Sequence, residues 1–323
     1  MKLQVFALWT DEENMRRAYN FTKEQIASFK EIEKQNSDRF QFANSYNEAL
    51  EVIKSGKLCG MMGIEGGSPV ENDIDRIDEF YKLGVRYIGL TWNNSNKIGT
   101  SAKDEHNRKV KGGLTNYGFK VIERMDKLGM LIDVSHSGEK TFWDVINTTK
   151  NPIIASHSDC YSLSPHYRNL TDDQIRAIAE KGGVIMVNFY DHFIDATNAD
   201  NIRTPNVYQR YSKELNEIYN NSGGDMIKFN IDREKFLSTI DLSKGVSVDK
   251  LIDHIDYIKN LVGADYIGLG SDYDGGITPP NELYDGTCYP IITRKLVERG
   301  YTELEIRKIL GLNFLRVFKQ VCG

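Results

Sequence analysis

Two short apolar runs of the sequence each end on a serine–histidine pair. Residues 131–136 read Leu-Ile-Asp-Val-Ser-His and residues 152–157 read Pro-Ile-Ile-Ala-Ser-His, while a third apolar run, 58–65, ends on Glu65. Two imidazoles and one carboxylate are a ligand set that zinc uses in catalytic sites, where a fourth position stays open to water. The sequence therefore predicts a metal site formed by Glu65, His136 and His157.

Three further residues are candidates for the same site. Asp272 and Trp92 end two more apolar runs, 266–272 and 85–92, and Arg168 lies just before a helix predicted over 171–181. A carboxylate at Asp272 could bind a metal or carry a proton, and the guanidinium of Arg168 could bind a carboxylate through two hydrogen bonds. The alternative for each is a plain structural role, with Arg168 on the surface.

A serine nucleophile is the competing interpretation of the two Ser-His pairs. Adjacent residues of a strand point to opposite faces, so Ser135 and Ser156 are expected to face away from whatever the histidines contact. The sequence also contains no G-x-S-x-G elbow. We therefore expect metal chemistry rather than a serine hydrolase.

The elements that must position these residues alternate between strands and helices. Seven runs have the length and continuous apolar character of buried strands: 3–9, 58–65, 85–92, 131–136, 153–157, 184–190 and 266–272. Amphipathic helical patterns lie between them, which indicates a parallel sheet. Polar residues at the ends of at least five runs favour a (β/α)₈ TIM-type barrel over an open sheet, because they converge at one mouth.

A barrel requires eight strands, and the pattern shows seven. The eighth is expected either upstream of Met1 or in a segment that the pattern does not reveal. We expect residues 1–323 to form one barrel domain, with the polar segment from about 191 to 246 as an inserted helical or loop segment near the mouth.

The composition narrows the class of partner. The 323-residue chain carries a formal net charge of −5 and has no run rich in lysine or arginine, which argues against nucleic acid and an anionic membrane surface and favours a small molecule. It shows no secretory signal and no membrane-spanning run, and its four cysteines are far apart. We therefore expect a cytoplasmic protein with reduced thiols.

Seven motifs, in order along nearly the whole chain, resemble those of one known family. They are 63–67 (GIEGG), 85–91 (VRYIGLT), 129–136 (GMLIDVSH), 155–158 (ASHS), 168–172 (RNLTD), 268–275 (GLGSDYDG) and 311–318 (GLNFLRVF). Together they resemble the membrane (renal-type) dipeptidases, a family of zinc peptidases. The resemblance implies a (β/α)₈ metallohydrolase that cleaves dipeptides, often with a D-residue at the C-terminal position.

The resemblance also implies roles for single residues. It makes Glu65 the bridge between two zinc ions, His136 and His157 ligands of the second zinc, and Asp272 a ligand of the first zinc and a proton shuttle. It makes Arg168 the group that binds the terminal carboxylate of the dipeptide.

The sequence departs from the family pattern in two places. The His-x-Asp pair that ends the first strand of the family and binds the first zinc is absent, so we expect at most one well-held metal ion in this chain. Trp92 stands where the best-studied members have a histidine that contacts the tetrahedral intermediate, and its indole can only donate an N–H. A barrel without one strand would leave open edges, which predicts lower stability or a homodimer.

Two other functions remain open at this point. The chain could be a non-catalytic relative that keeps the barrel and at most one metal ion, or another amidohydrolase-type hydrolase. The non-catalytic alternative follows from the absence of the His-x-Asp ligands. Against the amidohydrolase alternative, the sequence has no lysine placed convincingly at a strand end, where a carbamylated lysine would be expected.

Overall fold

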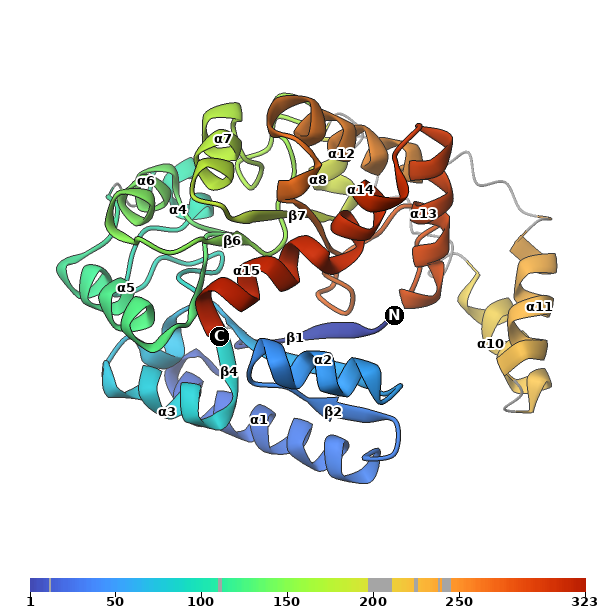
Figure 1. Cartoon of the computed structure of the whole chain (residues 1–323), viewed down its shortest axis with the longest axis horizontal. Coiled ribbons are helices and arrows are strands. Elements are labelled where there is room, and N and C mark those ends of the chain that lie inside the picture. Colours follow the sequence, from blue (N-terminus) through green and yellow to red (C-terminus); the bar gives the residue numbers. More distant parts are fainter. Residues whose placement is uncertain (12, 110–111, 197–210, 224–225, 238, 240–244) are drawn as a thin grey trace.

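The computed structural model describes residues 1–11, 13–109, 112–196, 211–223, 226–237, 239 and 245–323. Its centre is one sheet of eight strands, paired in parallel throughout and covered by helices (Figure 1). The strands are β1 (Leu3–Trp9), β2 (Phe40–Phe42), β3 (Leu58–Glu65), β4 (Val85–Gly89), β5 (Leu131–Asp133), β6 (Ile154–Ala155), β7 (Val184–Asn188) and β8 (Ile267–Gly270).

The strand order makes the sheet a curled half-barrel. It runs β1-β3-β4-β5-β6-β7-β8, and within the described residues neither β1 nor β8 pairs with a second strand. The strand missing from the sequence pattern is β2, which is only three residues long and pairs with the start of β3. Because β2 lies beside β3 and not between β1 and β8, it supplies an eighth strand without closing the barrel.

Five of the predicted strands end earlier than expected. β4 stops at Gly89, β5 at Asp133, β6 at Ala155, β7 at Asn188 and β8 at Gly270, so the predicted ends at 92, 136, 157, 190 and 272 were wrong. For His136 and Asp272 the reason is the backbone, since their φ angles of 67° and 57° lie in the left-handed region, which no strand accommodates. Of the candidate residues, only Glu65 belongs to a strand, and β1 and β3 have the predicted bounds.

Helices separate the strands and follow local sequence signals. They are α1 (Ala18–Gln35), α2 (Tyr46–Lys54), α3 (Asp75–Leu83), α4 (Ala102–His106), α5 (Asn116–Leu128), α6 (Glu139–Thr148), α7 (Asp172–Glu180), α8 (Asp191–Ile194), α12 (Val248–Val262), α13 (Tyr289–Glu298), α14 (Glu303–Arg307) and α15 (Asn313–Cys322). Thr171 and Thr302 begin α7 and α14 with capping boxes, in which the threonine hydroxyl accepts from a backbone N–H three residues on.

Helix α15 covers one end of the half-barrel and leaves the other end open for a site. Its buried residues Phe314, Val317 and Phe318 pack in one cluster with Leu131 and Val184, the first residues of β5 and β7. Figure 1 shows α15 crossing the centre of the molecule. The N-terminal ends of the strands are therefore covered, and the C-terminal ends carry the candidate residues.

Two helices lie in the segment that the sequence predicts as an insertion. α10 (Ser212–Ser222) and α11 (Met226–Leu237) pack on each other and lie to one side of the sheet (Figure 1), whereas residues 197–210 and 240–244 fall outside the described part of the chain. No helix among the described residues is long and apolar enough to cross a membrane.

Candidate metal centre

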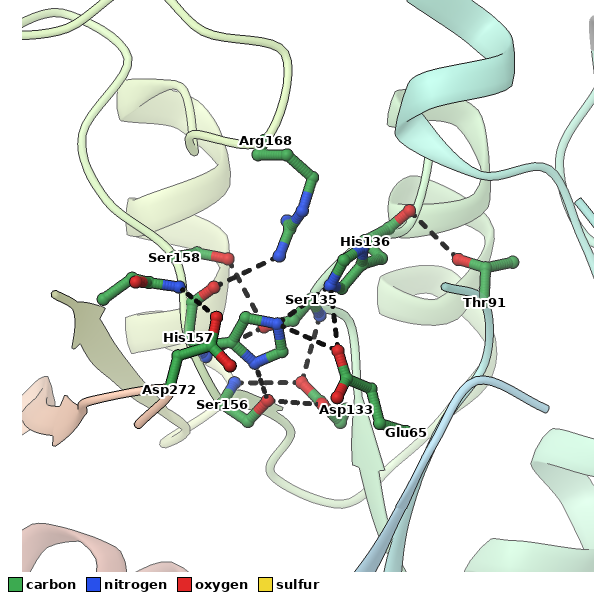
Figure 2. A network of polar contacts seen from close by, with 11 residues as sticks. Glu65, Thr91, Asp133, Ser135, His136, Ser156, His157, Ser158, Arg168 and Asp272 are labelled. Carbon is green, nitrogen blue, oxygen red and sulfur yellow. Dashed lines mark hydrogen bonds and ion pairs between the residues drawn. The ribbon is translucent and has the colours of Figure 1, made fainter. Parts of the chain in front are cut away.

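Three of the predicted ligands meet at the C-terminal ends of β3, β5 and β6 (Figure 2). Nε2 of His136 lies 2.9 Å from Nε2 of His157, and Oε1 of Glu65 lies 3.1 Å and 3.5 Å from these two nitrogens. Both histidines are buried, and Glu65 is largely so. This convergence of one carboxylate and two imidazoles is the arrangement predicted from the three run ends.

The two imidazoles are neutral in this environment. Burial lowers the pKa of His136 well below its ordinary value, and Arg168 nearby lowers it further. Burial also lowers the pKa of His157 to about 3, although the carboxylate of Glu65 acts in the opposite direction. We therefore regard neither contact with Glu65 as an ion pair, although both lie within ion-pair distance. At 3.1 Å from Oε1 of Glu65, Nε2 of the neutral His136 ring is placed to donate a hydrogen bond to that carboxylate.

The donor set and its spacing fit a metal ion such as zinc. Two atoms that each bind a tetrahedral zinc at about 2.0–2.1 Å lie about 3.3 Å apart, and the three separations here range from 2.9 to 3.5 Å. Neutral imidazoles and a carboxylate are also the protonation states that metal binding needs. These three residues form the group found among the described residues whose ligating atoms lie close enough to hold one ion.

The ring of His157 is anchored through its other nitrogen. Nδ1 of His157 lies 2.7 Å from the hydroxyl oxygen of Ser156, and that oxygen lies 2.6 Å from Oδ2 of Asp133 (Figure 2). Oδ1 of Asp133 accepts from the backbone N–H groups of Ser135 and Ser156, at 3.0 and 2.9 Å. Burial raises the pKa of Asp133 to about 6 despite these hydrogen bonds, which lower it.

Ser156 contacts the ring of His157, whereas strand alternation predicted that these two side chains point to opposite faces. That expectation assumed strand alternation, but β6 ends at Ala155, before the pair. The serine still does not form a catalytic triad, since it lies between the carboxylate and the imidazole and not at the free end of the chain of hydrogen bonds.

His136 is anchored through its backbone instead. Its carbonyl oxygen accepts from the hydroxyl of Thr91 at 3.0 Å and from the N–H of Ala102 at 2.8 Å, which supports the left-handed φ of 67°. Its Nδ1, in contrast, is buried and has no hydrogen-bond partner among the described residues.

Asp272 has a backbone conformation similar to that of His136 but lies outside the three-residue group. Its Oδ2 accepts from the side-chain amide of Asn188 at 3.3 Å. Burial, and then the negative charge of Glu65, raises its pKa to about 7. This carboxyl group can therefore change its protonation state near neutral pH.

Arg168 is buried beside the histidines and is not a surface residue. Its Nη2 donates to the carbonyl oxygen of His157 at 3.3 Å, and its guanidinium lies 5.4 Å from the ring centre of Phe193. Its Nε is buried without a partner in the part of the chain that the structure describes. Trp92 packs edge-on against Trp9, with ring centres 5.1 Å apart, and its ring centre lies 6.3 Å from that of His136. A buried cation and an indole thus flank the group of three ligands.

Three residues that contact the site were missed or set aside in the sequence. Asp133 lies inside an apolar run, Ser156 was expected to face away from whatever His157 contacts, and Asn188 at the end of β7 was not singled out. A signal for Asp133 was present, because a carboxylate in the middle of a buried strand requires hydrogen-bond donors.

Known proteins resemble this chain over nearly its whole length. Residues 1–322 match the membrane dipeptidase family, peptidase family M19. An uncharacterized dipeptidase of Schizosaccharomyces pombe is 30% identical over 97% of this chain, and the chain spans 65% of the length of that relative. An uncharacterized protein from the pqqA 5′ region of Klebsiella pneumoniae is 33% identical over 92% of this chain and 95% of its own length.

Solved structures share the fold. A metallopeptidase described as dipeptidase AC of family M19 has a TM-score of 0.80 at 22% identity, covering 99% of this chain and 86% of its own. A metallopeptidase from Rhodobacter sphaeroides, liganded with a phosphinate mimic of the dipeptide L-Ala-D-Ala, has a TM-score of 0.79 at 21% identity, covering 98% and 86%. The match over residues 1–322 and the two relatives show that this chain belongs to the membrane dipeptidase family, peptidase family M19.

Proposed function

We propose that this chain is a zinc-dependent dipeptidase whose metal is held by Glu65, His136 and His157. The observation that carries the proposal is the convergence of these three side chains, with both imidazoles neutral, at the free end of the half-barrel. Zinc at such a site supplies Lewis acidity and lowers the pKa of water to about 7.

The flanking residues suit a dipeptide. In this proposal Arg168, a buried cation with an unpartnered Nε, binds the terminal carboxylate of the substrate. Asp272, whose pKa is raised to about 7, transfers a proton to the amine that leaves when the peptide bond breaks. Trp92 forms part of the wall beside His136.

Two finer points belong to the same proposal. We extend to this chain a preference for a D-residue at the C-terminal position, supported by family membership and by the L-Ala-D-Ala mimic in the Rhodobacter sphaeroides neighbour. We also propose at most one well-held zinc ion per chain. Glu65, His136 and His157 supply three ligands to one ion, whereas Asp272 lies outside their group.

The test is hydrolysis of L-Ala-D-Ala, of L-Ala-L-Ala and of the C-terminal amide of each, by the purified chain with and without one equivalent of zinc. We expect cleavage that requires zinc, is faster for L-Ala-D-Ala, and is much weaker for the amides, which offer Arg168 no carboxylate. Glu65→Gln should lose both zinc and cleavage, and metal analysis should give no more than about one zinc per chain.

A non-catalytic relative is the second candidate, and the open half-barrel between β1 and β8 favours it. In that case the chain would bind one zinc with Glu65, His136 and His157 but cleave none of the four compounds. Cleavage of the amides or of simple esters in preference to free dipeptides would instead indicate another amidohydrolase-type hydrolase.

A further inference from the structure

We infer that Asp133 and Ser156 form a hydrogen-bonded relay that holds His157 in the tautomer protonated on Nδ1, with the lone pair of Nε2 aimed at Glu65 and His136. This makes Asp133 and Ser156 positioning residues. They act on the metal centre through the ring of His157 and are not themselves assigned as metal ligands or substrate-binding groups. The inference deepens the proposed function and rests on it only where zinc affinity is concerned.

The direction of the relay follows from the number of protons available. Ser156 has one hydroxyl hydrogen and lies within hydrogen-bond distance of both Oδ2 of Asp133, at 2.6 Å, and Nδ1 of His157, at 2.7 Å. An ionised carboxylate can only accept, so the hydroxyl donates to Asp133. Its oxygen is then left to accept, and the hydrogen of that second bond must come from Nδ1 of His157.

Hydrogen bonds from the backbone hold the carboxylate of Asp133 in the position in which it accepts from Ser156. Its other oxygen, Oδ1, is taken by two backbone N–H groups, those of Ser135 and Ser156, at 3.0 and 2.9 Å. The side chain is buried, with 1% exposure, and three donors converge on it. Because the backbone fixes the carboxylate, the hydroxyl of Ser156 is fixed in turn.

Protonation of His157 on Nδ1 decides the state of the other ring nitrogen, Nε2. With Nδ1 protonated, Nε2 carries a lone pair, and this atom lies 2.9 Å from Nε2 of His136 and 3.5 Å from Oε1 of Glu65. A metal ligand needs such a lone pair, and the partner of the other ring nitrogen selects the tautomer. His157 is therefore prepared for a metal ion before the ion arrives.

The first test replaces Asp133 by asparagine. The amide of Asp133→Asn can donate to Ser156, whose hydroxyl then donates to Nδ1 of His157 and forces the proton onto Nε2. In metal-free protein labelled with ¹⁵N-histidine, two-bond ¹H–¹⁵N correlations should show His157 protonated on Nδ1 in the wild type and on Nε2 in the variant. The signals are assigned with His157→Gln.

The second readout is zinc affinity, measured by competition with a chelator. We expect Asp133→Asn to bind zinc roughly 10–100-fold more weakly, as is typical for loss of an outer partner of a ligand. Asp126→Asn is the matched control, because Asp126 also accepts from a threonine hydroxyl and an amide but lies away from the site. It should change zinc affinity by no more than about twofold.

Two serine substitutions, one as the test and one as its control, probe the relay without altering the carboxylate. They keep the inference testable if Asp133→Asn does not fold. Ser156→Ala should weaken zinc binding by about tenfold, whereas Ser158→Ala, on the other side of His157 and bonded to Ser135, should not. Because the relay acts as a unit, adding Ser156→Ala to Asp133→Asn should cause no more than about a further twofold loss.

Either of two results would overturn the inference. One is a wild-type His157 protonated on Nε2. The other is a pair of relay variants that bind zinc as tightly as their controls. If the wild type binds no zinc at all, the proposed metal function fails, but the nitrogen signals of the metal-free protein still decide the tautomer.

Discussion

His136 and His157 follow the neighbouring strands β5 and β6, each in a Ser-His pair, yet the protein holds them in different ways. Nδ1 of His157 contacts Ser156, which is bonded to Asp133, so the ring itself is anchored. Nδ1 of His136 is buried and finds no partner within the described ranges, and hydrogen bonds to its backbone carbonyl hold the residue instead. One ligand is thus oriented through its ring and the other through its main chain.

The difference assigns different tasks to the two ligands. With the Nε2 lone pair of His157 facing it at 2.9 Å, Nε2 of His136 carries the hydrogen of that contact in the metal-free protein. Binding of a metal ion through Nε2 of His136 would therefore require the ring proton to move to Nδ1, while His157 is already prepared. Two candidate ligands that look equivalent in the sequence thus differ in tautomer, because the partner of the second nitrogen differs.

Removing either ring gives the largest expected effect and tests whether the two are equal as ligands. His136→Ala and His157→Ala should each weaken zinc binding by more than the roughly 10–100-fold expected for the relay variants, since each deletes one of three ligands. Chelator competition measures this, with His106→Ala, at an exposed position, as the control. A His136→Ala chain that binds zinc normally would remove His136 from the centre.

The buried carboxylates around the two histidines give an intermediate effect that depends on pH. In the metal-free chain the pKa of Asp133 is raised to about 6 and that of Asp272 to about 7, above the value of 3.8 for an unfolded aspartate. The folded chain therefore keeps protons that the unfolded chain releases. Hence the free energy of unfolding should fall as pH rises from about 4 to about 7.

Asp272→Asn should remove part of this dependence, because an amide does not ionise. We expect the metal-free variant to be about 1–3 kcal/mol more stable than the wild type at pH 8 and nearly equal to it at low pH. Urea unfolding at pH 4 and pH 8 measures this, with Asp126→Asn as the control. Parallel pH profiles of wild type and Asp272→Asn would contradict the prediction.

The smallest expected effect concerns the backbone anchor of His136. Thr91→Val keeps the shape of the side chain but removes the hydroxyl that donates to the carbonyl of His136, which should destabilise the fold by about 1 kcal/mol. Thr91→Ser keeps the hydroxyl and should restore the hydrogen bond. If Thr91→Val weakens zinc binding as much as Ser156→Ala, the main-chain anchor matters as much as the ring anchor.

Much of the fold could be predicted because buried parallel strands leave a strong pattern. All seven predicted runs contain strands of one parallel sheet, and β1 and β3 have the predicted bounds. β2 was missed because three residues are too short for any periodicity. The ends at His136 and Asp272 were wrong because left-handed φ angles cannot be read from apolar content.

The candidate site also has residues that the sequence predicted and features that it did not reveal. Glu65, His136 and His157 were expected together, since parallel strands bring their C-terminal ends to one edge. Arg168 was predicted as a carboxylate-binding residue, with a surface position as the alternative, and it is buried, while Asp272 lies outside the ligand group. Which atoms meet depends on turns whose conformation the sequence pattern does not reveal.

By itself the sequence determined the chain order of seven of the eight strands and which three candidate metal ligands converge, because chain order and residue type decide which groups reach the C-terminal edge of a parallel sheet. Only the tertiary structure decided how each ligand is prepared. Asp133 and Ser156 reach the ring of His157 across two strand ends, and no partner reaches Nδ1 of His136. Hydrogen bonds between separate strand ends depend on three-dimensional register and turn geometry, which a pattern along one chain does not contain.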